Sequence, residues 1–194
     1  MLDDKCSIIR LPKIILASGS PRRAEILNAV GWSFEKYVAD IDESEIAGES
    51  PENYVQRLAQ TKAETIAVKF PGQIVLGADT TVVIEHQIIG KPADLIEAKK
   101  MLEMLSGKWH EVLTGVALVK NENSSVGLQS TKVKFSEMSE SEIEFLVEKG
   151  EPLDKAGAYA VQAQAALFIE KIEGDYWNVV GLPVNLVYNL YKQF

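Results

Sequence analysis

Apolar residues along the chain form two patterns, short continuous runs and repeats spaced three and four positions apart. Continuous runs are typical of buried strands, and the second spacing is typical of helices that bury one face. Strands are predicted over residues 14–17, 34–38, 74–78, 110–120 and 125–135. The helical spacing, with its start and stop residues, predicts helices over residues 21–30, 51–69, 93–105 and 140–149, and a last helix that begins at Pro183.

Two hairpins complete the predicted elements. One pairs residues 82–84 with 87–89, and the other pairs 161–172 with 176–180 around a turn at Glu173-Gly174-Asp175. Helices and hairpins alternate irregularly, which favours an α/β fold with a mixed, twisted central sheet and flanking helices over a strictly doubly wound fold. No internal repeat and no sharp boundary divides the chain, so residues 1–194 are predicted to form a single domain.

The chain is acidic, with 28 Asp and Glu residues against 20 Lys and Arg residues and a net charge of −8. Such a surface repels nucleic acid and anionic lipid at long range, so neither is an expected partner. A small anionic ligand would need a local basic cluster or a metal ion to offset this charge.

The N-terminal segment contains Cys6, the only cysteine of the chain, which excludes an intrachain disulfide and is interpreted as an incidental thiol. The same segment carries two aspartates and no apolar run of the length that a signal peptide needs. Because no window approaches the ~20 apolar residues of a membrane span, the expected location is the cytoplasm.

The first chemical signal lies between the first predicted strand and the first predicted helix, in Ser18-Gly19-Ser20-Pro21-Arg22-Arg23. A helix N-terminus presents unpaired N–H groups and the positive end of the helix dipole. Ser18 and Ser20 add hydroxyl donors, and Arg22 and Arg23 add permanent positive charge. The segment predicts a phosphate site, with a capped helix and solvated arginines as the alternative; it does not match the Walker pattern.

Carboxylates gather at two places. An acidic loop holds Asp40, Asp42, Glu43 and Glu45, and Asp79 follows an apolar strand, at the type of strand end where α/β sheets commonly place their sites. Carboxylate oxygens are ligands that Mg²⁺ and Mn²⁺ prefer, and a carboxylate beside a metal orients water. The alternatives are a solvated loop and an aspartate that caps a turn.

Two lysines and one small-residue segment add weaker signals. Lys62 and Lys91 can each neutralise phosphate, although most lysines are surface residues. The segment 154–162, Asp154-Lys155-Ala156-Gly157-Ala158-Tyr159-Ala160-Val161-Gln162, permits close approach of a ligand and ends in an amide that both donates and accepts. A tightly packed corner is the alternative for this segment. His86 and His110 lie on different predicted elements, without metal-ligand spacing, and are interpreted as structural.

Taken together and in this order, these segments resemble the Maf family of nucleotide pyrophosphatases. The matching pieces are Ser18-Gly19-Ser20-Pro21-Arg22-Arg23, Asp42-Glu43, Lys62, Gly77-Ala78-Asp79-Thr80, Gly90-Lys91-Pro92, Asp154-Lys155-Ala156-Gly157-Ala158-Tyr159, Gln162 and Val180-Gly181-Leu182-Pro183. Each motif alone is weak, but the ordered set is specific and covers nearly the whole chain after an N-terminal extension, residues 1–12.

The resemblance implies an elongated fold like that of inosine-triphosphate pyrophosphatases, with two lobes around a cleft, and a homodimer. It also implies hydrolysis of a nucleoside triphosphate to the monophosphate and pyrophosphate with a divalent cation. The run Asp154 to Tyr159, with Gln162, looks like the branch of the family that acts on dTTP and UTP. We therefore expect dTTP and UTP as substrates, and modified pyrimidine triphosphates in addition.

The resemblance further implies that Asp79 is the proton acceptor and that base selectivity involves Arg22, Thr80 and Gln162. We expect the phosphate chain to bind Ser18, Ser20, Arg22, Arg23, Lys62 and Lys91. We expect Glu43 and Asp79 to hold Mg²⁺ or Mn²⁺, and the catalytic set to be Asp79, Glu43 and Lys91. Ala163 stands where the family usually has glycine, and its Cβ is expected to narrow the base pocket.

Two other functions remain open from the sequence. One is the same chemistry on ITP or 7-methyl-GTP. The other is a non-catalytic nucleotide-binding regulator, for example of cell division. Glu43, Asp79 and Lys91 argue against a regulator, because a protein that only binds nucleotide does not need to activate water.

Overall fold

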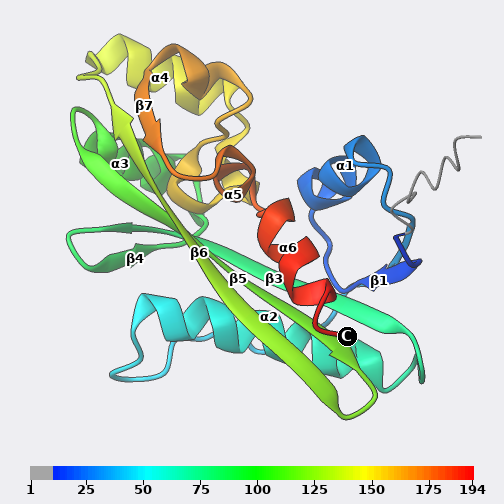
Figure 1. The fold of residues 1–194 in the computed structure, drawn as a ribbon. Helices are drawn as coiled ribbons and strands as arrows, with labels where there is room; N and C mark the ends of the chain where they lie inside the picture. The colour runs from blue at the N-terminus through cyan, green and yellow to red at the C-terminus, as the bar shows by residue number, and fades with distance from the viewer. Residues whose placement is uncertain (1–10) are drawn as a thin grey trace, which may run out of the picture.

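The computed structural model describes residues 11–194, and a seven-stranded mixed sheet runs through it (Figure 1). The strands are β1 (Ile14–Leu16), β2 (Phe34–Lys36), β3 (Ile74–Ile84), β4 (Gln87–Ile89), β5 (Trp109–Lys120), β6 (Asn123–Phe135) and β7 (Ile169–Glu173). They lie in the order β2-β1-β3-β5-β6-β7, and β4 pairs with β3. β1 is parallel to β2 and β3, and the other pairings are antiparallel, which confirms the predicted mixed sheet.

Six α-helices and three short 3-10 helices flank this sheet within residues 11–194. The α-helices are α1 (Pro21–Ala29), α2 (Pro51–Ala67), α3 (Leu95–Leu105), α4 (Glu140–Lys149), α5 (Tyr176–Val180) and α6 (Val184–Tyr191). The 3-10 helices are η1 (Pro152–Asp154), η2 (Ala156–Ala158) and η3 (Gln164–Leu167). Side-chain caps fix several starts: Ser50 accepts from the Asn53 N–H at α2, and Ser139 with Glu142 forms a capping box at α4.

The sheet is covered on both faces. α2 lies along one face, where Ala59, Ala63 and Ile66 pack with Val75 and Ala117 in a small core. The larger core on the other face takes side chains from the remaining helices, including Leu27, Leu102, Leu146 and Leu190. Figure 1 shows α3, α4 and β7 at one end of the long strands β5 and β6, and α1, β1 and the C-terminus at the other end.

Two glycines bring α2 unusually close to the sheet. A Cβ on Gly77 would lie 2.1 Å from the Ala59 carbonyl oxygen, and a Cβ on Gly115 would lie 2.2 Å from the Val55 carbonyl oxygen. Real side chains cannot approach backbone this closely, so only glycine allows α2 to rest on β3 and β5 at this distance.

The structure corrects the expected position of Asp79. Residues 74–78 and 82–84 were expected as separate strands, but they form the single strand β3, and Asp79 lies in its middle opposite Gly115 of β5. On its other edge, β3 pairs with β1 through residues 74–76 and with β4 through residues 82–84. Asp79 therefore lies on the stretch between these two partners, and this stretch is where the cavity described below opens.

The predicted hairpin of residues 161–172 with 176–180 is wrong. Only β7 is a strand in this region; residues 164–167 form η3, and residues 176–180 form α5. Asp175, expected in the hairpin turn, is the N-cap of α5, and its carboxylate accepts from the Trp177 and Asn178 N–H groups. The apolar residues after Asp175 suit a strand by propensity, and a helix cap with tertiary contacts overrides that preference.

Residues 1–10 lie outside the described part of the chain, so the interpretation of Cys6 and most of the predicted extension 1–12 fall outside it. Among the described helices, none combines the length and apolar character required to cross a membrane.

Candidate active site

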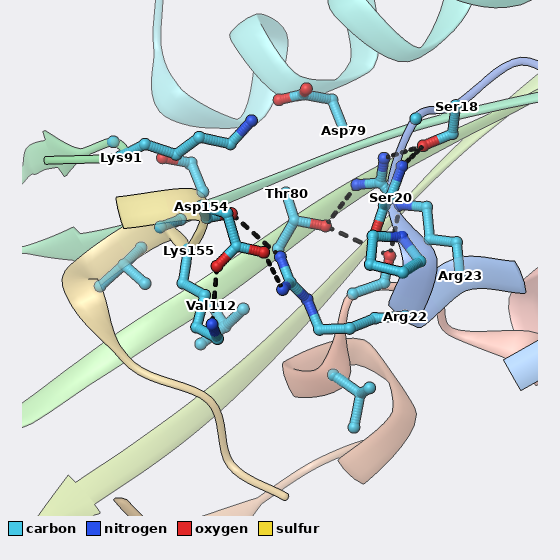
Figure 2. A pocket seen from close by; sticks show the side chains of 18 of the residues that line it. Ser18, Ser20, Arg22, Arg23, Asp79, Thr80, Lys91, Val112, Asp154 and Lys155 are labelled. Carbon is cyan, nitrogen blue, oxygen red and sulfur yellow. Dashed lines mark hydrogen bonds and ion pairs between the residues drawn. The ribbon is translucent and has the colours of Figure 1, made fainter. Parts of the chain in front are cut away.

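A cavity of about 490 Å³ opens beside the middle of β3. It is bounded by the β1–α1 loop, α2, the β4–α3 loop, the η1–η2 segment and the α5–α6 turn. Figure 2 shows labelled side chains of this cavity coming together from segments far apart in the sequence. All ten predicted site residues line it: Ser18, Ser20, Arg22, Arg23, Glu43, Lys62, Asp79, Thr80, Lys91 and Gln162.

The cavity reaches both faces of the sheet because neighbouring residues of β3 point to opposite sides. Gly77 and Asp79 face α2, which carries Lys62. Thr80 faces the other side, where Arg23 and Thr114 contact it. Asp79 and Thr80 therefore reach the cavity from opposite faces of β3, and Thr81 and Val82 of the same strand also line it.

Lys62 joins the two predicted catalytic carboxylates. Its ammonium nitrogen lies 2.6 Å from Asp79 Oδ1 and 2.7 Å from Glu43 Oε1. Lys62 and Asp79 are buried, at 8% exposure each, whereas the Glu43 side chain is about half exposed. Three groups predicted separately from the sequence thus form one acidic-basic cluster with a single solvent-facing member.

Burial and nearby cations shift the pKa of a carboxyl group in opposite directions, and the balance differs between Asp79 and Glu43. Burial raises the pKa of Asp79, and Lys62 and Arg23 only partly oppose that rise. Burial also favours a higher pKa for Glu43, but the hydrogen bond and charge of Lys62, with Lys91 and Arg23, outweigh it and lower the pKa. Asp79 is therefore the more basic of the two carboxylates, as suits a proton acceptor.

Side chains of α2 hold the loop that carries Glu43. The Tyr54 hydroxyl donates to the Glu43 carbonyl oxygen at 3.0 Å, and burial raises the pKa of Tyr54 to about 12, which keeps that proton in place. Arg57 donates to the Ser44 carbonyl oxygen at 3.1 Å and pairs through two nitrogens with Glu49. The position of Glu43 thus depends on α2, the helix that also supplies Lys62.

Arg23 connects three segments inside the protein. Its guanidinium donates to the Gly181 carbonyl oxygen at 2.9 Å, to Ser18 Oγ at 2.9 Å and to Thr80 Oγ1 at 3.0 Å. The Thr80 hydroxyl also lies 2.9 Å from the Thr114 hydroxyl. A guanidinium has five N–H donors, so Arg23 keeps donors for a ligand after these three bonds.

Arg22 points across the cavity to a different partner. Its Nη1 lies 2.7 Å from Asp154 Oδ2, and its Nη2 donates to the Asp154 carbonyl oxygen at 3.1 Å (Figure 2). Lys155 Nζ lies 2.6 Å from the other carboxylate oxygen of Asp154. Adjacent arginines of α1 therefore have separate settings, one in the interior and one at Asp154.

The remaining predicted residues are more exposed. Lys91 and Gln162 are exposed residues of the lining, and Figure 2 shows the Lys91 side chain extending toward Asp79. Ala163, whose Cβ is expected to narrow the base pocket, is not among the residues that line the cavity. His86 lies exposed in the β3–β4 turn and His110 is buried, and neither lines the cavity.

The carboxylate pair suits a hard divalent cation that is shared with a ligand. Glu43 and Asp79 converge on one cation, the Lys62 ammonium, and both offer oxygen donors. Within residues 11–194, no group of three or more His, Cys, Asp or Glu side chains could hold a metal ion. Magnesium in phosphate-handling sites commonly takes one or two carboxylates and completes its shell with phosphate oxygens and water, so two carboxylates suffice.

The sequence patterns assigned no role to Tyr54, and they named Asp154 and Lys155 as part of a small-residue segment and of a family motif, without a role for either side chain. The sequence places Tyr54 and Lys62 on one predicted helix, but it does not show that both contact the loop that carries Glu43. The Arg22–Asp154 pair joins residues 132 positions apart, and no local pattern reveals such a pair.

The mixed sheet, with a cavity lined by Arg, Lys, Asp and Glu side chains between helices and strand edges, defines an α/β protein with a site suited to a phosphorylated small molecule. The fold is similar to that of the Staphylococcus aureus Ham1 protein, with a TM-score of 0.55 and 13% identity over 94% of this chain and 99% of that one. At that identity the likeness concerns the fold alone.

The chain belongs to the Maf family, described as Maf-like protein, which matches residues 13–194. Among its relatives is the dTTP/UTP pyrophosphatase of Symbiobacterium thermophilum, 49% identical over 95% of each chain. Another is the dTTP/UTP pyrophosphatase of Bacillus anthracis, 47% identical over 94% of this chain and 95% of the relative. The resemblance stated from the motifs is confirmed.

Proposed function

We propose that this protein hydrolyses dTTP and UTP to the monophosphate and pyrophosphate. The carrying observation is the position of Asp79, a buried carboxylate of raised pKa in a cavity that is also lined by Lys62, Arg23 and Lys91. Such a site combines an acceptor for the proton of water with cations for a polyphosphate. The names of the relatives supply the base preference of the proposal.

The phosphate chain binds along the β1–α1 loop and the lysines. Ser18 and Ser20 donate hydrogen bonds at the start of α1, where the helix dipole favours an anion. Lys62 and Lys91 supply charge, and Arg23 uses its free donors. When phosphate binds, the Lys62 ammonium either leaves its two carboxylate partners or contacts phosphate and carboxylates together.

Asp79 orients the attacking water and accepts its proton. Its place in the middle of a long strand, between β5 and α2, holds the carboxylate rigidly against the cavity. Glu43 and Asp79 would hold a divalent cation, with Mg²⁺ or Mn²⁺ as the candidates, which would offset phosphate charge and increase the acidity of water. Glu43 is the more accessible of the two carboxylates and is positioned by Tyr54 and Lys62.

Arg22, Thr80 and Gln162 face the nucleoside. The amide of Gln162 both donates and accepts, so it can pair with the edge of a uracil or thymine ring. Such an edge contact ignores the 5-position, which is why modified pyrimidine triphosphates belong to the proposed substrates.

A homodimer, a cytoplasmic location and the lack of a nucleic-acid partner complete the proposal. The acidic surface, with a net charge of −8, supports the last of these. Light scattering of the purified protein tests the dimer: twice the chain mass supports it, and the mass of one chain contradicts it.

A substrate panel tests the proposed activity. Pyrophosphate release is measured from dTTP, UTP, CTP, GTP, ITP and 7-methyl-GTP, with Mg²⁺, with Mn²⁺ and with a chelator. Metal-dependent release from dTTP and UTP is expected. Release confined to ITP or 7-methyl-GTP would keep the chemistry and overturn the base preference, and binding without any release would favour a nucleotide-binding regulator.

A further inference from the structure

The charged side chains of the cavity form two groups. Asp79 and Glu43 interact with Lys62 and Arg23, and Glu43 also with Lys91. Asp154 interacts with Lys155 and Arg22: burial favours a higher pKa for its carboxyl group, but hydrogen bonds from these two cations outweigh burial and lower the pKa. In this second group, Arg22 and Lys155 therefore both contact the Asp154 carboxylate.

Arg22 is held in this second group by two bonds to one residue. Nη1 donates to the Asp154 carboxylate, and Nη2 donates to the carbonyl oxygen of the same residue. Two bonds from a planar guanidinium fix its plane as well as its place, and the carboxylate offsets its charge. The donors that remain are directional N–H groups of an arginine whose charge the Asp154 carboxylate, shared with Lys155, partly offsets.

The position of Arg22 in the chain would otherwise favour phosphate. It follows Ser20 and Pro21 at the N-terminus of α1, beside the loop that is proposed to bind the phosphate chain, and an arginine there is a natural bidentate phosphate ligand. The side chain instead crosses the cavity to the η1–η2 segment (Figure 2). Asp154 is the group that draws it there.

We infer that Asp154 is a positioning residue for nucleoside selectivity, which holds Arg22 as a donor for the neutral nucleoside and away from the phosphate chain. This inference rests on the proposed function and deepens it. The acceptors that such a donor meets are the ring carbonyl oxygens of a pyrimidine, of which uracil and thymine carry two and cytosine one. In the proposed reaction Asp154 acts through Arg22 and does not contact the substrate.

The Asp154→Asn variant tests this inference, because asparagine keeps the size and one acceptor oxygen while removing the charge. We expect the ratio of kcat/KM for UTP over CTP to fall about fivefold, the size expected of a partly exposed ion pair. We also expect inorganic tripolyphosphate to inhibit about fivefold more strongly, because Arg22 and Lys155 are then free to bind phosphate. Asp154→Glu, which restores the charge, should recover part of both effects.

Glu35→Gln is the matched control. Glu35 lies on β2, outside the cavity, and the substitution removes the same charge from its exposed ion pair with Lys13. An equal loss of kcat/KM for all nucleotides, with unchanged tripolyphosphate inhibition, would show a merely structural role and overturn the inference. Measurements of ligand binding test the inference independently of turnover. If the wild-type protein releases no pyrophosphate, the proposed function fails, and calorimetric titration with UMP and with tripolyphosphate still shows whether Asp154→Asn exchanges nucleoside binding for phosphate binding.

Discussion

At the scale of single residues, the site depends on how one buried ammonium is shared. Lys62 lies within 2.7 Å of both Glu43 and Asp79, and its single positive charge offsets part of the charge of carboxylates that would otherwise repel a polyphosphate. Burial leaves Asp79 with a raised pKa and makes it the better proton acceptor of the pair. The proposed reaction and the packing of the site therefore depend on the same three side chains.

Asp79→Asn should separate these two contributions. Turnover is expected to fall at least ~100-fold, because the amide cannot accept the proton of water. Folding should persist, since Lys62 keeps Glu43 as a partner and asparagine fills the same volume. Steady-state kinetics and thermal unfolding measure the two effects, and near-normal turnover in a folded variant would remove Asp79 from its role.

His110 makes a separate, testable contribution to stability. It is buried, stacks on Phe135 and lies 2.8 Å from the Tyr159 hydroxyl, while its Nδ1 has no partner within the described residues. Burial lowers the pKa of His110 from 6.5 to about 4. Between these two pKa values His110 is protonated in the unfolded chain and neutral in the folded protein. The free energy of unfolding therefore increases with pH across this interval.

From this shift, the free energy of unfolding should fall by about 3 kcal/mol between about pH 7 and about pH 4 through His110 alone. In His110→Gln, which keeps a hydrogen-bonding group near Tyr159, that part of the pH dependence should be missing. Urea unfolding of both proteins at the two pH values measures the difference. Identical pH dependence would mean that His110 titrates normally in the folded protein.

At the scale of elements, α2 is the helix on which the site depends most. It supplies Lys62, holds the Glu43 loop through Tyr54 and Arg57, and touches the sheet through Gly77 and Gly115. The spacing of helix and sheet is therefore set by two residues without side chains.

Gly115→Ala should lower stability and activity together. The added methyl group would lie 2.2 Å from the Val55 carbonyl oxygen, so α2 must move away. We expect a loss of about 2–3 kcal/mol in the free energy of unfolding, with reduced turnover, because Lys62 moves with the helix. Gly127→Ala is the control: its methyl group would meet only the ends of flexible side chains, Leu186 at 2.9 Å and Leu190 at 3.4 Å, which can rotate.

The same scale shows where sequence patterns suffice and where they fail. The predicted helix 51–69 and the predicted strands 110–120 and 125–135 match α2, β5 and β6 almost to their ends. The pattern failed at α5, whose residues favour a strand. Asn178 is completely buried there and donates to the Val112 carbonyl oxygen and to Thr131, and these tertiary contacts favour a helix that local propensity does not predict.

At the scale of the whole molecule, the cavity exists because β3 is longer than either partner on one edge. β1 leaves β3 after Leu76 and β4 joins it at Val82, and of the residues between them 79–81 line the cavity. Sequence motifs identified the residues that gather there, since each carries its own chemical signal. They did not identify the pairs Lys62–Asp79 and Arg22–Asp154, because these pairings arise only when the sheet and its helices assemble.

The measurement that tests the central claim most directly is the identity of the products formed from UTP. Phosphorus NMR of the reaction with Mg²⁺ should show UMP and pyrophosphate in equal amounts, with no reaction after a chelator is added and almost none in Asp79→Asn. The appearance of UDP and inorganic phosphate, or undiminished formation of UMP by Asp79→Asn, would contradict the proposed reaction and the role of Asp79 in it.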